Sequence, residues 1–155
     1  MEIVKIYTSP SHNFVGHKGL PPGDEPAVER DCIECVAGHG IREDRYFDHC
    51  DDYKGQITFF AEEVYQALCD ELLVHETPAS AARRNVITRG VDLNSLIGQE
   101  FEVQGVRFAG VEECRPCGWM EGAFAPGAKE FLKGRGGLRA RILSDGVLRV
   151  TAAQT

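Results

Sequence analysis

The sequence predicts a mainly β protein of the α+β class, built as a single antiparallel β-barrel with a few short helices on its rim. Three observations lead to this prediction. Short runs of β-branched and aromatic residues recur along the chain, and glycine-containing turns separate most of them. Only one segment has the length and apolar spacing of a full amphipathic helix. Many short strands joined by turns are typical of closed or nearly closed β architectures.

The first 60 residues predict three strands. Residues 3–7 alternate in polarity, residues 28–36 form a longer run of the same kind, and residues 56–60 form a short apolar one. Residues 9–24 are rich in Ser, Gly, Pro and His, which predicts a long loop. Loops of this length within a compact domain are usually functional or mobile.

The clearest helix is predicted over residues 61–73. Its apolar residues Ala61, Val64, Leu68 and Leu72 recur at helical spacing, with acidic residues on the other faces. A second short helix is expected after residues 77 and 78, a Thr-Pro pair that suits an N-cap followed by the first helical position. Residues 92–98 predict one capped helical turn ended by glycine, and residues 126–132 a third short helix.

The remaining strands are expected mostly in pairs. Residues 85–88 are strand-like, and residues 100–103 and 106–111 predict a hairpin around a Gln-Gly turn. Residues 138–143 and 147–150 predict a last hairpin across Ser-Asp-Gly at 144–146, where glycine suits a positive φ.

Length and composition favour a single globular domain over residues 1–155. The chain has 43% hydrophobic and 26% charged residues and no internal repeat or linker. A formal net charge of -7 argues against nucleic acid or an anionic membrane as partner. No apolar stretch reaches the length of a membrane span, and the N-terminal residues lack the apolar core of a signal peptide. We therefore expect a cytoplasmic protein with six reduced cysteines.

Cys114 and Cys117 carry the strongest chemical signal of the sequence. A thiolate is both a nucleophile and a soft-metal ligand, and a cation such as Arg115 favours its formation. Pro116 and Gly118 flank Cys117 in a segment that fits neither regular strand nor regular helix. Cys117 is therefore expected at a strand end, accessible to a cleft. The alternative is that both cysteines are ordinary small core residues.

Cys32 and Cys35 form a second pair with the same spacing, which raises two other readings. Two such pairs can bind structural zinc through four thiolates. Most of the domain separates these pairs, however, and residues three apart in a strand face opposite sides. A thioredoxin-like redox pair needs a βαβ context, whereas these surroundings are mostly β. Both readings stay open as alternatives.

Several arginines and one tryptophan are further candidates. Arginine suits a bidentate grip on phosphate, although each could equally be a solvated surface charge. Trp119, beside the cysteine pair, could wall a cofactor pocket or simply pack in the core. The arginines in question are Arg83, Arg84, Arg89, Arg139 and Arg141.

Taken together, five blocks of the sequence resemble the MOSC domain family, named for the C-terminal domain of molybdenum-cofactor sulfurases. They come in the family's order and cover nearly the whole chain. The blocks are Val-Ala-Gly-His-Gly-Ile-Arg-Glu-Asp-Arg at 36–45, Arg-Arg-Asn-Val-Ile-Thr-Arg-Gly-Val-Asp-Leu-Asn at 83–94, the hairpin at 97–108, Glu-Cys-Arg-Pro-Cys at 113–117 and the segment at 136–147.

The resemblance implies a β-rich barrel-like fold and a site for the molybdenum cofactor, a pterin that carries a phosphate and a molybdenum atom bound to its dithiolene. By motif position, Cys117 would be the molybdenum ligand or a carrier of persulfide sulfur. The resemblance also implies cofactor-binding roles for a set of residues in the matching blocks. These are Asp44, Arg45, Arg83, Asn85, Arg89, Asp92, Asn94 and Cys114.

The family also suggests activities and partners. A molybdenum-dependent reductase of N-hydroxylated compounds would take electrons from a separate protein, because no flavin, haem or iron–sulfur motif is visible. A non-catalytic sulfur carrier would need a sulfur-donor protein. Pyridoxal phosphate is not expected in this chain. The sequence departs from the family at Glu43, where members often have Gly, and in the 9–19 loop, which lacks their early Lys-Ser.

Overall fold

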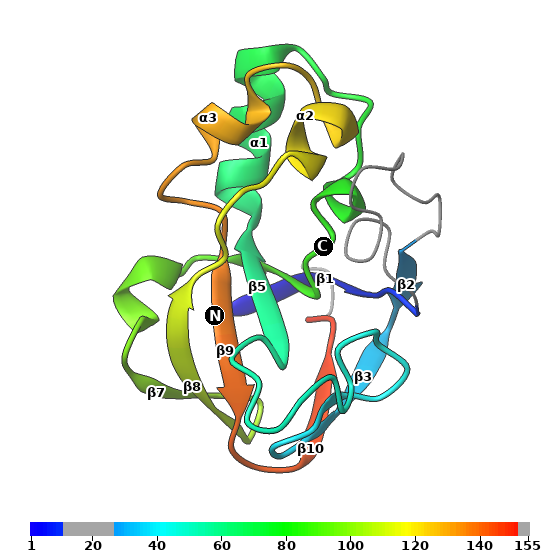
Figure 1. Cartoon of the computed structure of the whole chain (residues 1–155), viewed down its shortest axis with the longest axis vertical. Coiled ribbons are helices and arrows are strands. Elements are labelled where there is room, and N and C mark those ends of the chain that lie inside the picture. Colours follow the sequence, from blue (N-terminus) through cyan, green and yellow to red (C-terminus); the bar gives the residue numbers. More distant parts are fainter. Residues whose placement is uncertain (11–26, 152–155) are drawn as a thin grey trace.

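The computed structural model describes residues 1–10 and 27–151, which form two β-sheets and a group of short helices. Figure 1 shows three helices, α1 (Glu62–Leu72), α2 (Trp119–Ala123) and α3 (Ala128–Phe131), gathered at one end of the molecule and most strands toward the other. Most of the loop expected over residues 9–24 lies outside the described residues. The strands are β1 (Glu2–Thr8), β2 (Val28–Arg30), β3 (Cys32–Val36), β4 (Gly40–Ile41), β5 (Ile57–Ala61), β6 (Val86–Arg89), β7 (Glu100–Val103), β8 (Val106–Glu113), β9 (Leu138–Ile142) and β10 (Gly146–Arg149).

The mainly β class is confirmed, whereas the expected closed barrel is not found. Seven strands form an open sheet in the order β2-β1-β6-β5-β9-β8-β7, and three form a second sheet in the order β10-β3-β4. Nearly all neighbouring strands are antiparallel, but β5 and β6 run parallel. The helical connection between β5 and β6, α1 with η1, accounts for this pair, because parallel neighbours need a crossover.

The strand predicted over residues 28–36 is divided in two at Asp31. β2 pairs with β1 in the larger sheet, and β3 pairs with β10 and β4 in the smaller one. The carbonyl of Asp31 accepts a hydrogen bond from Val150 N at 3.0 Å. One continuous pattern of alternating polarity therefore contributes strands to two sheets. The alternation does not show that the segment changes from one partner strand to another.

The predicted hairpin over residues 138–150 was wrong in its pairing. β9 joins β5 and β8 in the larger sheet, while β10 pairs with β3 in the smaller one. Ser144 and Asp145 hold the crossing between the sheets, accepting hydrogen bonds from Arg107 N and Ala37 N at 2.9 and 2.8 Å. The Ser-Asp-Gly segment is thus a crossover rather than a hairpin turn. The other predicted hairpin, β7 with β8, is confirmed.

The helices follow the prediction in part. α1 (Glu62–Leu72) is confirmed, with acidic residues in its first turn and a left-handed residue, Leu73, as its C-cap. Pro78 rather than Thr77 is the N-cap of η1 (Ala79–Ala82), and no side chain caps it. Asp92 caps η2 (Leu93–Leu96) as expected, by accepting from Asn94 N. α3 (Ala128–Phe131) is shorter than predicted, and α2 (Trp119–Ala123) was not predicted.

No helix in the described part of the chain is long and apolar enough to cross a membrane.

Two hydrophobic cores lie on opposite sides of the central strand β5. Phe59 belongs to the core that also contains Ile33 and Leu148 of the smaller sheet. Its neighbour Phe60 belongs to the core beneath the helices, with Leu68 of α1. Consecutive strand residues face opposite sides, so one strand contributes to both cores. The cysteine pair follows β8, at the boundary between the large sheet and the helices.

Candidate functional site

Cys114 and Cys117 lie in the irregular segment between β8 and α2. Cys114 is buried at 3% exposure, whereas Cys117 is exposed. Met120 N donates a hydrogen bond to Cys117 O at 3.0 Å, which places Cys117 at the turn that opens α2. A strand end followed by an accessible Cys117 is the arrangement that the flanking Pro116 and Gly118 predicted.

Arg84 fixes the backbone of this segment. Its guanidinium donates to the carbonyls of Ala82 and Gly136 at 3.0 Å each and to that of Cys114 at 3.3 Å. A planar fork of donors can serve three carbonyls at once, which a lysine ammonium does less well. Arg84 thus ties three chain segments together beside the cysteine pair.

Gly136 allows the closest backbone approach at this place. A Cβ atom added to Gly136 would lie 2.1 Å from the carbonyl oxygen of Cys114. Beside it, Cys114 N donates to Gly137 O at 2.8 Å. A glycine is therefore required here for the segment before β9 to pack against the cysteine segment.

Asp44 and Asn85 form a buried hydrogen-bond network. Asp44 Oδ1 accepts from Ser9 N at 2.9 Å and from Asn85 Nδ2 at 3.3 Å. Asn85 Oδ1 accepts from the backbone N and the hydroxyl of Thr58, each at 3.0 Å. Both residues were expected to bind a cofactor. The structure brings them together, and their polar atoms form hydrogen bonds within the chain.

Arg45 and Arg83 lie next to this network and to each other. Arg45 Nη2 donates to Arg83 O at 3.4 Å, and its guanidinium stacks over the ring of Tyr46. Arg83 is buried at 9% exposure, and its φ of 56° makes it the left-handed C-cap of η1. Its guanidinium lies over Trp119, with Cζ 5.7 Å from the ring centroid.

Trp119 connects the arginines to the cysteine segment. It lies two residues after Cys117, and its indole nitrogen donates to Ala81 O in η1 at 2.7 Å. The contact with Arg83 and this hydrogen bond hold the start of α2 against η1. The convergence of Arg45, Arg83 and Cys117 on one concave surface stays a prediction.

Arg139 of β9 provides the cation beside Cys114. Burial would lower the pKa of Arg139, but its electrostatic interactions with Cys114, Tyr53 and Glu112 raise the pKa overall. Arg139 Nη1 lies 3.5 Å from Glu112 Oε1. Burial first, and then the charge of Tyr46, raise the pKa of Tyr53 to about 12. The buried thiol therefore has a positive neighbour.

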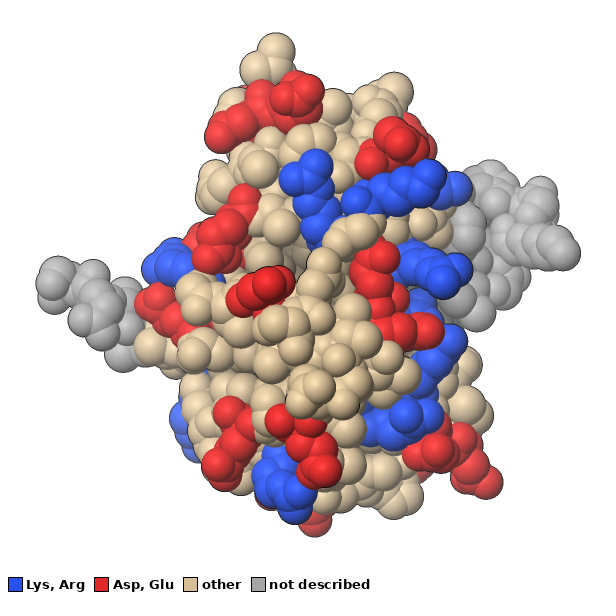
Figure 2. All heavy atoms as spheres, turned by 90° about the vertical axis from the view of Figure 1, so that its left-hand side faces the viewer, with Lys and Arg blue, Asp and Glu red and all other residues tan. Residues whose placement is uncertain are grey.

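A cavity of about 540 Å³ opens beside the cysteine segment. Its lining includes Arg115 and Pro116, which lie between the two cysteines, and charged residues of α2 and α3. Glu121, one of these, accepts from Gly127 N at 2.8 Å and Lys129 N at 3.1 Å. Figure 2 shows acidic and basic side chains interspersed over one face of the molecule. Local rather than overall charge would have to hold an anion.

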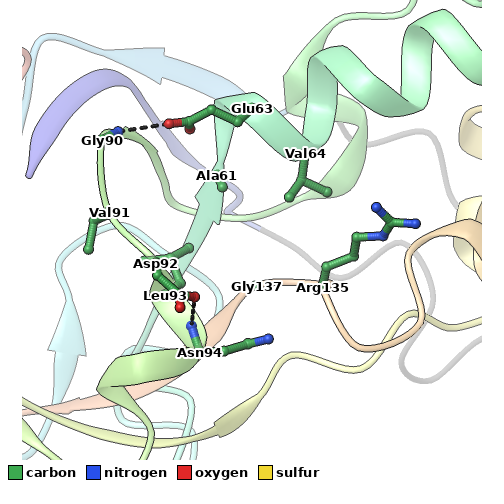
Figure 3. A pocket seen from close by; sticks show the side chains of 10 residues that line it. All are labelled: Ala61, Glu63, Val64, Gly90, Val91, Asp92, Leu93, Asn94, Arg135 and Gly137. Carbon is green, nitrogen blue, oxygen red and sulfur yellow. Dashed lines mark hydrogen bonds between the residues drawn. The ribbon is translucent and has the colours of Figure 1, made fainter.

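Three other predicted cofactor residues lie elsewhere. Arg89 pairs with Glu2 and Glu62 on the surface. Asp92 and Asn94 line a separate cavity of about 320 Å³, drawn in Figure 3, with Arg135 at its rim. Asn94 Nδ2 donates to Gly134 O at 2.8 Å, and Asp92 caps η2. Their lining set contains neither cysteine of the pair, so sequence proximity to Arg83 does not make them part of one pocket with Cys117.

The second cysteine pair lies on β3, with Cys32 exposed and Cys35 buried on opposite faces. Burial raises the pKa of the Cys35 thiol to about 12. Within residues 1–10 and 27–151, no group of three or more His, Cys, Asp or Glu side chains could hold a metal ion. The described part of the chain therefore contains no cluster of ligands that would support a structural zinc site.

Sequence reasoning missed the roles of Arg84, Gly136 and Tyr53. Arg84 looked like Arg83 in the sequence, since a pair of adjacent arginines does not show which one turns inward. Gly136 belongs to a glycine-rich stretch whose packing partner is remote in sequence. Their roles arise from tertiary contacts for which the sequence carries no local signal.

Comparison with known proteins gives a consistent result. The model of the MOSC domain matches residues 44–153. The crystal structure of the YuaD protein from Bacillus subtilis superposes with a TM-score of 0.74 at 16% identity, covering 96% of this chain and 91% of that one. No curated protein matches the chain in sequence.

Two further crystal structures are similar in fold. YiiM from Geobacillus stearothermophilus has a TM-score of 0.67 at 15% identity, covering 96% of this chain and 70% of that one. YiiM from Escherichia coli has a TM-score of 0.68 at 13% identity, covering 97% of this chain and 66% of that one. At these identities the likeness concerns the fold alone.

Proposed function

This chain belongs to the MOSC domain family, and from that membership we propose that it handles the molybdenum cofactor through the thiol of Cys117. The observation that carries the proposal is the position of this thiol. Cys117 is exposed at the turn that opens α2, and the contact of Trp119 with Arg83 joins that turn to the arginines. A soft ligand thus lies two residues before a tryptophan that contacts one of the cations that suit phosphate.

Three side chains have the chemistry that binding of the cofactor would need. The Cys117 thiolate suits molybdenum, and Arg45 and Arg83 would face the phosphate of the pterin. Asp44 and Asn85 would position these arginines instead of touching the cofactor, because their polar atoms are bonded to Ser9, Thr58 and each other. When bound, the cofactor would supply a redox-active metal. The chain would supply the thiolate and the cations.

In its enzymatic form, the proposal is a reductase of N-hydroxylated compounds. Such a protein would receive electrons from a separate redox partner, which would have to reach the face that exposes Cys117. This substrate class and this partner come from the family resemblance and stay proposals.

A second candidate is a carrier of sulfur on Cys117. It is favoured by one observation, the exposure of the Cys117 thiol. A carrier passes its sulfur to an external nucleophile, which has to reach the sulfur that the thiol bears.

The experiment that tests both is a measurement on protein purified from cells that make the cofactor. Molybdenum and zinc would be measured by elemental analysis, pterin by fluorescence after oxidation, and sulfane sulfur by intact mass. Molybdenum with pterin supports the cofactor ligand, sulfane sulfur without molybdenum supports the carrier, and zinc without either overturns the proposal. A Cys117→Ser variant should lose what the wild type holds, whereas a Cys50→Ser variant, which removes another exposed thiol, should keep it.

A further inference from the structure

The cavity drawn in Figure 3, about 320 Å³ in volume, lies where the two hydrophobic cores meet. Leu93, Val91 and Ala61 line it from the core that joins the two sheets. Val64 of α1 lines it from the core beneath the helices. These four side chains form an apolar floor. The volume is within the range of small-molecule sites, which begins at about 300 Å³.

Three charged side chains, Glu63, Asp92 and Arg135, surround the apolar floor. All three are exposed, and none forms an ion pair with another residue of the described part of the chain. The charges next to them in sequence are paired, since Arg89 Nη2 lies 2.6 Å from Glu62 Oε2. The cavity therefore presents charges of both signs that have no ionic partner within residues 1–10 and 27–151.

Each carboxylate is held in place by one backbone amide. Glu63 Oε2 accepts a hydrogen bond from Gly90 N at 2.8 Å, and Asp92 Oδ1 accepts one from Asn94 N at 3.2 Å. The second oxygen of each carboxylate has no hydrogen-bond partner among the described residues. Two fixed carboxylates with one available oxygen each suit the several donors of an ammonium group.

Arg135 is held apart from these carboxylates by its contacts with Phe131. Its Nε donates to Phe131 O at 2.8 Å, and its Cζ lies 4.1 Å from the centroid of the Phe131 ring. Figure 3 shows Arg135 on one side of the cavity and Asp92 on the other. The Nη atoms of Arg135 have no hydrogen-bond partner in the described part of the chain. A guanidinium edge of this kind suits a carboxylate.

We propose that this cavity binds an α-amino acid with an apolar side chain. Its ammonium group faces Glu63 and Asp92, its carboxylate faces Arg135, and its side chain contacts Leu93 and Val64. A ligand with one charge would leave the charge on the other side of the cavity without a partner. Because the protein groups are already fixed, little conformational entropy is lost when the ligand binds.

This site is separate from the one proposed for the cofactor. The lining of the cavity includes neither Cys114 nor Cys117. The inference therefore does not depend on the role of Cys117, and each can fail without the other.

Binding can be measured by heteronuclear NMR titration of the whole chain with L-leucine, L-methionine and L-phenylalanine. The amide signals of Gly90 and Gly137, which line the cavity, should shift. The signal of Gly105, between β7 and β8, should not. Isoamylamine, which lacks the carboxylate of leucine, and isocaproate, which lacks its ammonium group, should each bind on the order of tenfold more weakly than leucine.

Arg135→Gln tests the carboxylate end of the ligand. It should weaken leucine binding on the order of tenfold and should not weaken binding of isoamylamine, which has no carboxylate. Arg107→Gln is the matched control, because Arg107 is an exposed arginine that pairs with Glu100 outside the cavity. It should bind leucine as the wild type does.

Glu63→Gln combined with Asp92→Asn tests the ammonium end. The amide oxygens can still accept from Gly90 N and Asn94 N, so the local structure is kept while both negative charges are lost. Leucine should bind on the order of tenfold more weakly to this variant, whereas isocaproate should bind no more weakly than to the wild type.

The proposal is overturned if none of the three amino acids shifts the Gly90 and Gly137 signals, or if either single-charge analogue binds as tightly as leucine. It is also overturned if Arg107→Gln weakens leucine binding as much as Arg135→Gln does. Cys117→Ser should bind leucine as the wild type does. A loss of leucine binding in Cys117→Ser would place the ligand at the cysteine segment and reject this cavity.

Discussion

The guanidinium of Arg84 donates a hydrogen bond to the carbonyl oxygen of Cys114, with Nη2 and O 3.3 Å apart. This contact joins the start of β6 to the segment that carries the proposed reactive thiol. It makes Arg84, rather than its neighbour Arg83, the residue that holds the backbone of the cysteine pair.

Arg84→Lys should lower the free energy of unfolding by about 2–3 kcal/mol. An ammonium cannot reproduce the fork that serves Ala82, Cys114 and Gly136, and hydrogen bonds from charged donors contribute about 1.5–3 kcal/mol each. Urea unfolding would measure the change. Arg107→Lys, in an exposed pair with Glu100, is the matched control and should cost less than about 0.5 kcal/mol. Equal losses in the two variants would show that the fork does not stabilise the fold.

Asn85→Ala should destabilise the protein with no cofactor present, by about 2–4 kcal/mol. The change removes one donor from the buried Asp44 carboxylate and leaves the backbone N of Thr58 without its buried acceptor. Asn94→Ala removes one exposed hydrogen bond to Gly134 O and should cost at most about 1 kcal/mol. Thermal or urea unfolding of the two cofactor-free variants makes the comparison. If Asn85→Ala is no worse than Asn94→Ala, the amide does not support the site.

Glu43 has a φ of 69°, in the left-handed region, at the position where the family often has Gly. It also pairs with Arg30 at 3.1 Å, a contact that any shortened side chain loses. Glu43→Gly and Glu43→Ala both lose the ion pair with Arg30, so the difference in stability between them measures the effect of the backbone conformation alone. The Gly variant should be more stable than the Ala variant by about 1 kcal/mol in urea unfolding. A more stable Ala variant would mean that the turn does not need this conformation.

The sequence predicted local elements well, but it did not predict which distant strands pair with each other. α1, the β7–β8 hairpin and the Asp92 cap are each encoded within a dozen residues, and all three are confirmed. The division of residues 28–36 at Asp31 and the crossover before β10 depend on which distant strand pairs with each half. An alternation pattern gives the face of a strand but not its neighbour.

The same limit applies to the candidate site. The exposure of Cys117 followed from Pro116 and Gly118, which are adjacent in sequence. The resemblance grouped Asp92 and Asn94 with Arg83, yet the cavity that they line does not include this arginine, because β6 lies between them in the chain. The interaction of Arg139 on β9 with Cys114, which follows β8, depends on the pairing of two strands remote in sequence, and no local pattern encodes it.

Tyr53 predicts a loss of stability at alkaline pH. Its pKa is raised from 10.0 to about 12, chiefly by burial, so the folded state holds its proton more tightly than the unfolded chain. Its contribution is fully present below pH 10 and falls as the pH rises toward 12. Tyr53→Phe should flatten the dependence of unfolding free energy on pH in this range, measured beside wild type. An unchanged slope would show that the Tyr53 hydroxyl ionises as easily in the folded state as in the unfolded chain.

The most direct test of the central claim is the amount of molybdenum and sulfane sulfur that the protein retains after mixing with cofactor released from a molybdoenzyme, or with polysulfide. Wild type, Cys117→Ser and Cys50→Ser would be compared after gel filtration, each checked for native unfolding behaviour. Cys117 and Cys50 are both exposed thiols, so exposure alone cannot separate them. The account predicts that Cys50→Ser retains as much as wild type and that Cys117→Ser retains little of either. Equal retention by Cys117→Ser and wild type would contradict it.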